Sequence, residues 1–127
     1  MDKSLKAFLN PPKKANIRFK LGRFTEPFEL RILSAKEDME INKEVKQGED
    51  FTYTMARYIA NSLVTPDLHN QELLEALSER EGRKIFDVTE ALLCLVNGNE
   101  LATLIGVYND FADCTLDFEK EVQETKN

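Results

Sequence analysis

The sequence is poor in the residues that most often build metal and redox sites. Histidine occurs once, as His69, with no cysteines or acids around it at metal-ligand spacing. The two cysteines, Cys94 and Cys114, form no CxxC pair. Cys94 lies in the apolar run 91–96, where we expect a reduced thiol that packs as a small hydrophobic side chain, rather than a disulfide or a reactive thiol. We therefore expect no metal and no cofactor.

Catalytic signatures are also missing. The sequence contains no GxSxG, Walker, GxGxxG, HExxH or EF-hand pattern. The acidic residues of 37–44 are expected to form a solvated helix face, because nothing near them in sequence would bury them and shift their pKa. The expectation is that the chain is not an enzyme.

Long hydrophobic runs and an excess of cations are absent. No apolar run approaches the roughly 20 residues that span a bilayer, and the N-terminus lacks the apolar core of a signal peptide. The formal net charge of the 127 residues is −6, with a pI near 4.9, whereas proteins that bind nucleic acid concentrate Lys and Arg on one face. We expect a cytoplasmic protein that binds neither nucleic acid nor membrane.

What is present is typical of one α+β domain, mostly α. Residues 17–21 and 28–32 alternate apolar and polar side chains, which predicts two half-buried strands, and the linker between them has turn residues, which predicts an antiparallel hairpin. A lone hairpin is barely stable in water, so helices must cover its apolar face, or another copy of the chain must pair with its edges.

About five short helices follow the hairpin. Ser34 and Glu37 form a capping box for a helix that ends near Lys46. The second helix begins after Asp50, has the core stripe Phe51, Met55, Tyr58, Ile59 and Leu63, and runs into Val64 before Thr65-Pro66-Asp67 stops it. The other three begin near Asn70, at Asp87 and after Asn97-Gly98, a pair expected to close the helix before it; the last presents Leu101, Leu104, Ile105, Tyr108, Phe111 and Ala112 on one face.

The predicted organisation has three parts. Residues 1–16 form an N-terminal arm, because Leu5, Phe8 and Leu9 are helically spaced but Asn10-Pro11-Pro12 stops the helix. This arm is either a frayed terminus or a segment that packs on its own domain or on a neighbouring subunit. Residues 17–112 form the domain, and residues 113–127 form a charged C-terminal helix or tail.

Several stretches, in their order, resemble the XkdN-like family of phage tail assembly chaperones. They are Leu5–Leu9, Pro27–Ser34 with Glu37, Ile59–Leu73, Asn97–Leu101 with Leu104 and Val107, and Phe118–Asn127. Residues 78–86, together with Leu63 and Thr65, depart from the family pattern.

The resemblance implies a mostly helical protein in the cytoplasm of a bacterial host, encoded by a phage or prophage. Its partners would be the aggregation-prone tape-measure protein and the tail-tube subunits, and it would self-associate into a homo-oligomer. We expect an exposed apolar surface to mask the hydrophobic segments of the client, by packing of a helix in a groove. The expected partner-binding residues are Leu5, Phe8, Leu9, Phe111, Leu116, Phe118 and Val122, although ordinary packing would also explain them.

Two other functions remain open at this stage. One is a structural tail component, a completion or joining protein that stays in the particle. The other is a regulatory adaptor of the host, which the absence of a tape-measure gene directly downstream would favour.

Overall fold

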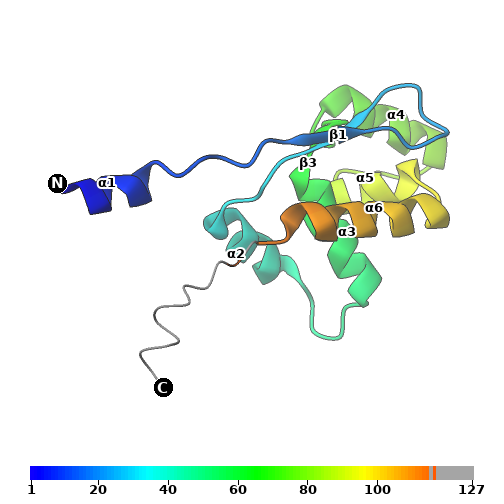
Figure 1. The fold of residues 1–127 in the computed structure, drawn as a ribbon. Coiled ribbons are helices and arrows are strands. Elements are labelled where there is room, and N and C mark those ends of the chain that lie inside the picture. The colour runs from blue at the N-terminus through cyan, green and yellow to red at the C-terminus, as the bar shows by residue number, and fades with distance from the viewer. Residues whose placement is uncertain (115, 117–127) are drawn as a thin grey trace, which may run out of the picture.

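The computed structural model describes residues 1–114 and 116 of the chain (Figure 1). The fold is α+β and mostly helical, as predicted, with a small antiparallel sheet. In chain order the elements are α1 (Lys3–Leu9), β1 (Ile17–Phe19), β2 (Phe28–Leu30), α2 (Ala35–Glu44), α3 (Phe51–Ser62), β3 (Leu63–Thr65), α4 (Gln71–Glu81), α5 (Val88–Leu95) and α6 (Gly98–Ala112).

The predicted hairpin is present, but its strands are shorter than expected. β1 and β2 pair antiparallel with Ile17 opposite Leu30 and Phe19 opposite Phe28. Phe28 and Leu30 are buried, and Glu29 between them is only half-buried, which is the period-two pattern of a strand with one face on the core. Each strand has three residues, and the chain turns after β1, where the carbonyl oxygen of Leu21 accepts from the amide of Phe24 at 2.9 Å.

A third strand corrects the sequence prediction. The helix that we expected to run into Val64 ends at Ser62, and β3 pairs antiparallel with β2, with an irregular register at Glu29 and Leu30. The amide of Arg31 donates to the carbonyl oxygen of Ser62 at 3.0 Å, and the Ser62 hydroxyl donates to the carbonyl oxygen of Arg31 at 2.5 Å. These two bonds join the end of α3 to β2, so the residues after Ser62 continue as the third strand.

Capping residues set the starts of the helices. Ser34 with Glu37 and Asn97 with Glu100 form complete capping boxes, and the side chains of Asp50, Asn70 and Asp87 accept from early backbone amides of α3, α4 and α5. Asn97-Gly98 was expected to close a helix. Instead Asn97 is the N-cap of α6 and Gly98 is its first residue. The sequence reading was wrong here because the two helices follow each other with almost no linker.

The core lies between the sheet and helices α3, α5 and α6, with α4 against α5 and α2 against α3. Ile59, Leu92 and Leu104 are fully buried in it. Phe51, predicted as a core residue, is 70% exposed because it occupies the first helical position after the Asp50 cap. Arg57, a cation, is buried, and its guanidinium lies 2.5 Å from a carboxylate oxygen of Glu49.

The N-terminal arm differs sharply from the rest of the described chain. Every residue from 1 to 16 is exposed, whereas the buried core residues lie between Leu21 and Phe111. Figure 1 shows α1 standing away from the body at the end of an extended linker. Among the described residues, no helix has the length and hydrophobicity needed to cross a membrane.

Candidate partner-binding surface

Helix α1 presents an apolar face that nothing in the described chain covers. Leu5, Phe8 and Leu9 recur at the spacing of one helix face and are 54%, 82% and 65% exposed. Phe8 is the most exposed large hydrophobic side chain among the described residues. Asp2 caps the helix, since its carboxylate accepts from the amide of Leu5 at 2.9 Å. The sequence therefore encodes a formed amphipathic helix whose apolar side is free for a partner.

The root of the arm is fixed to the body by Lys14. Its ammonium group donates to the carbonyl oxygens of Phe111 and Asp113, at the C-terminal end of α6, and lies 5.2 Å from the centre of the Phe111 ring. A cation suits this position, because the free carbonyls at a helix C-terminus carry partial negative charge. Asn16 adds a second tie, donating to a carboxylate oxygen of Glu29 at 3.0 Å. The arm is thus held where it leaves the body, while α1 stands beyond these contacts.

The predicted C-terminal contact residues behave differently from those of the arm. Phe111 is 5% exposed and belongs to the core, so its ring is not available to a partner, which corrects its assignment to an exposed surface. Leu116 is 72% exposed. Phe118 and Val122 lie outside the described residues. The structure therefore groups the three arm residues on one helix and separates Phe111 from them.

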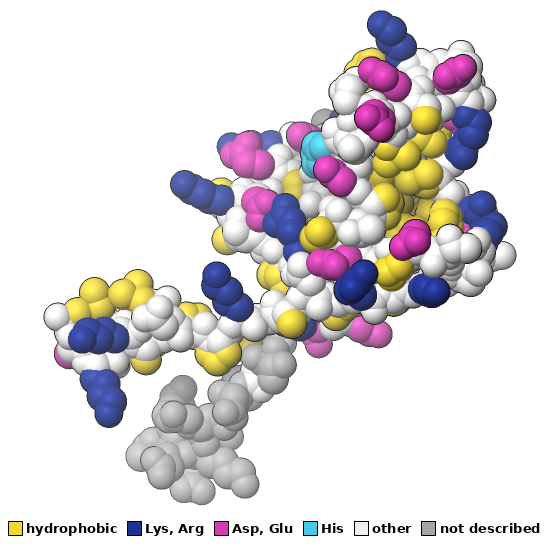
Figure 2. Space-filling view, turned by 90° about the horizontal axis from the view of Figure 1, so that it is seen from above, with side chains coloured by type: hydrophobic (Ala, Val, Ile, Leu, Met, Phe, Trp, Pro, Cys, Tyr) yellow, Lys and Arg dark blue, Asp and Glu magenta, His cyan; other side chains and the backbone are white. Residues whose placement is uncertain are grey.

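An apolar groove that the sequence reading missed lies on the body. It has a volume of about 190 Å³ and is lined by Phe24, Pro27, Phe28, Pro66, Leu73 and Leu95. Glu26 and Thr65 complete the lining. Figure 2 shows hydrophobic side chains gathered in a hollow of the body, with acidic and basic side chains around it. The groove is therefore a small, concave and mostly apolar surface on the body.

Arg23 holds the loop that forms one wall of the groove. Its guanidinium donates to both carboxylate oxygens of Glu100, at 3.0 and 2.7 Å, and to the carbonyl oxygen of Leu95 at 3.0 Å. It also lies 4.7 Å from the centre of the Phe24 ring, and that ring meets Phe28 edge-on at 5.1 Å. The hydrogen bond from Arg23 lowers the pKa of Glu100. These contacts of Arg23 join the loop to the start of α6 and to the end of α5, and they hold one wall of the groove in place.

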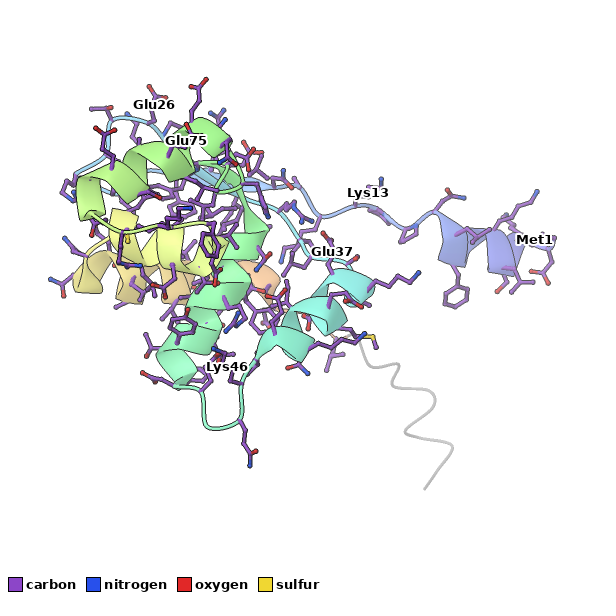
Figure 3. All side chains as sticks on the ribbon, turned by 180° about the vertical axis from the view of Figure 1, so that it is seen from behind. Met1, Lys13, Glu26, Glu37, Lys46 and Glu75 are labelled. Carbon is purple, nitrogen blue, oxygen red and sulfur yellow. The ribbon has the colours of Figure 1, made fainter. Side chains whose placement is uncertain are left out.

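Charge differs between the arm and the groove. Residues 1–16 contain four lysines and one aspartate, a net charge of +3, so residues 17–127 carry −9 of the chain total of −6. Helix α4, which supplies Leu73 to the groove, contains four glutamates and one arginine, a net charge of −3. Figure 3 shows Glu26 and Glu75 on the same side of the body, beside α4. The arm is thus basic, and the one charged residue that lines the groove is acidic, Glu26.

The other strongly perturbed ionisable groups belong to structural pairs. Hydrogen bonds from Arg31 and from the backbone of Ser34 lower the pKa of Glu37 to about 2. Hydrogen bonds from Arg57 and Thr54 lower the pKa of Glu49 to about 2. Burial and a hydrogen bond to Glu90 raise the pKa of Tyr53 to about 12. Each shift follows from a contact that ties helices or strands together.

Metal-ligating side chains do not cluster in the part of the chain that the structure describes. No group of three or more histidine, cysteine, aspartate or glutamate side chains there could hold an ion. His69 is exposed, and its Nδ1 atom lies 3.6 Å from a carboxylate oxygen of Asp67.

Sequence reasoning missed the groove because its residues come from four separate segments. Thr65-Pro66 was recognised only as a helix stop, and Phe24 and Pro27 only as turn residues. The half-buried Leu73 and Leu95 follow ordinary helical spacing, so neither position differs in sequence from a core leucine. The aromatic and proline content of the turn Gly22–Pro27 was the one local signal of an apolar loop.

Comparison with known proteins yields no relatives. No family model, no curated protein and no solved structure matches this chain.

Proposed function

We propose that the protein is a phage or prophage tail assembly chaperone, without catalytic activity, that binds the tape-measure protein and supports assembly of the tail tube. The observation that carries the proposal is the uncovered apolar face of α1, with Leu5, Phe8 and Leu9 exposed on a helix held away from the body. The resemblance to XkdN-like chaperones supplies the identity of the client.

The physical mechanism is temporary masking of apolar surface. A long helical client exposes hydrophobic stripes before it is packed inside a tail tube, and such stripes associate with one another in water. An amphipathic helix offers side chains at positions i, i+3 and i+4, which is the pattern that pairs with another apolar helix face. Lys3 and Lys6 on the same helix would add attraction to acidic client segments.

Coexpression with the tape-measure protein of the same genome tests this function. The wild-type chain is expected to keep the client soluble and to copurify with it. The variant Leu5→Ser/Phe8→Ser/Leu9→Ser is expected to lose both effects, because it removes the apolar face and leaves the core untouched. The matched control is Met39→Ser/Phe51→Ser/Phe86→Ser, which removes three other exposed hydrophobic side chains, 62%, 70% and 78% exposed, from the body.

Two further observations separate this function from its alternatives. Mass spectrometry of purified virions is expected to lack the protein, and its stable presence there would instead support a structural tail component. A tape-measure gene directly downstream is expected, and its absence would support a host adaptor.

A further inference from the structure

We propose that residues 116–119 pair in parallel with β1 of the same chain, as a fourth strand on the outer edge of the sheet, with Leu116 beside Ile17. Of these C-terminal residues only Leu116 belongs to the described part of the chain. The segment is identified from its sequence and from the place to which the described chain leads. The pairing concerns the chain by itself and does not depend on the client.

The outer edge of β1 has no strand beside it in the part of the chain that the structure describes. The sheet has the order β1-β2-β3, so β1 pairs with β2 on one side only. No described residue outside the sheet forms a backbone hydrogen bond with Ile17–Phe19. The peptide groups of an open edge are a template for a further strand, and proteins usually cover or protect such an edge. β1 can therefore accept one more strand.

The described chain brings the C-terminal segment to the beginning of β1. The ammonium group of Lys14 donates to the carbonyl oxygens of Phe111 and Asp113. Figure 1 shows α6 ending on the side of the body where β1 begins. The backbone of Asp113 is already extended, with φ −61° and ψ 139°, so the helix has ended. Residues 113–115 are long enough for the connection, because helix-to-strand loops commonly have about two to six residues.

The prolines of the arm decide the direction in which the segment runs. If it ran from Lys14 back along the arm, it would lie beside Pro11 and Pro12, which have no backbone N–H to donate to it. If it runs along β1, every residue beside it has a backbone N–H. The segment is then parallel to β1, and the domain between them supplies the long connection that parallel strands require.

The apolar residues of the segment match those of β1. Leu116 and Phe118 alternate with two acidic residues, which is the period of a strand. In the proposed register they lie beside Ile17 and Phe19, whose half-buried side chains pack against the core. The fourth strand therefore extends the apolar face of the sheet.

Charge is complementary on the opposite face. Lys20 is exposed, and Arg18 lies 3.4 Å from Glu29 but keeps 67% of its side chain exposed. The same register places Asp117 and Glu119 beside these two cations. Opposite charges on neighbouring strands stabilise the pairing, and like charges oppose it. The edge of β1 therefore favours this acidic segment over the β1 edge of another copy, which would bring cations together.

Nuclear magnetic resonance of the full chain tests the pairing. The amides of residues 116–119 are expected to exchange with solvent about tenfold or more slowly than those of a peptide of the same sequence, and their carbon chemical shifts should be those of a strand. Lys20→Glu should remove this protection, because it places two carboxylates side by side, and Lys20→Glu/Glu119→Lys should restore it. The control Lys36→Glu reverses an exposed cation on α2 and should change nothing. Exchange at the rate of the peptide, or helical chemical shifts, would overturn the proposal.

Disulfide formation tests the register and the face of the strand. In a Cys114→Ser background, Lys20→Cys/Glu119→Cys is expected to form an internal disulfide with oxidised glutathione about tenfold faster than the matched control Lys20→Cys/Lys120→Cys. Residues 119 and 120 are almost equally far along the chain, but in a strand they point to opposite faces. Peptide mapping by mass spectrometry identifies the bond.

The contrary outcomes are distinct from one another. Equal rates for the two cysteine pairs would mean that the segment presents no fixed face to β1. A disulfide found only between two copies would place the segment on another chain. Either result contradicts the proposed pairing. Circular dichroism of each variant checks the fold, since Lys20, Lys36 and Cys114 are exposed.

Discussion

At the residue scale, the structure shows how buried polar groups are accommodated. Arg57 is almost completely buried, but its guanidinium contacts Glu49 and lies 5.3 Å from the centre of the Tyr53 ring. Ser62 is fully buried and donates to the carbonyl oxygen of Arg31. Thr89 is the exception among the described residues, since its hydroxyl oxygen is buried without a hydrogen-bond partner. Such a group is expected to cost stability.

Replacement of this threonine is therefore predicted to stabilise the fold. Thr89→Val keeps the shape of the side chain and removes the unpaired hydroxyl, and it should raise the free energy of unfolding by about 1 kcal/mol. The backbone amide of Thr89 still donates to Asp87, so the cap of α5 is preserved. Urea unfolding monitored by circular dichroism measures the change. A loss of stability of similar size would mean that the hydroxyl is satisfied in solution.

Acid sensitivity is predicted at Glu49. Its pKa is lowered to about 2 in the folded chain by Arg57 and Thr54. A lowered pKa stabilises the fold above the ordinary glutamate pKa, and this contribution is lost as the pH falls from about 5 towards 2. Glu49→Gln should therefore lower the melting temperature at pH 7 and flatten its decline between pH 5 and pH 2.

The control is Glu40→Gln, in an ion pair with Lys43 whose side chains are 71% and 69% exposed. Water screens such a pair, so this variant should melt like the wild type at every pH. Equal pH profiles for the Glu49 variant and the wild type would contradict the assignment.

At the element scale, the alternation of apolar and polar side chains was enough to predict the hairpin. The N-cap residues were enough to predict most helix starts, because both signals are local in sequence. Ser34, Asp50, Asn70 and Asp87 each cap the helix expected after them. β3 was not predictable in this way, since Leu63–Thr65 continues an apolar helical pattern and becomes a strand only through pairing with β2. The groove was missed for the same reason, because its walls meet only in the folded chain.

The loop between the hairpin strands is predicted to depend on Arg23. Arg23→Ala removes both bonds to Glu100 and the bond to the Leu95 carbonyl. Because Arg23 is more than half exposed, global stability should change little. The amide of Phe24, bonded to the carbonyl of Leu21, should exchange with solvent several-fold faster.

Arg23→Lys tests whether the loop needs the several hydrogen bonds that one guanidinium can donate, or only a positive charge. Lysine keeps the charge but cannot donate to two carboxylate oxygens and a carbonyl in one fixed geometry. It should therefore resemble Arg23→Ala in amide exchange at Phe24. If the lysine variant exchanges like the wild type, charge alone holds the loop.

At the scale of the whole molecule, the chain combines a folded body with an apolar arm. The body buries its own core, and the arm is held at its root by Lys14 but covered by nothing among the described residues. Leu5, Phe8 and Leu9, which the sequence analysis named as partner-binding residues, are exposed, and their binding to a partner stays a prediction. The sequence did not predict the burial of Phe111, because that residue has the spacing of a helix face and only packing decides which face is inside.

Hydrogen exchange of the α1 amides tests the central claim most directly. At a concentration where the chain is monomeric, the amides within Lys3–Leu9 should exchange rapidly, because the helix is short and uncovered. Addition of purified tape-measure protein is expected to slow their exchange at least tenfold, and the Leu5→Ser/Phe8→Ser/Leu9→Ser variant should show no such protection. Binding of the client with unchanged exchange in α1, or with protection confined to the body, would contradict the account.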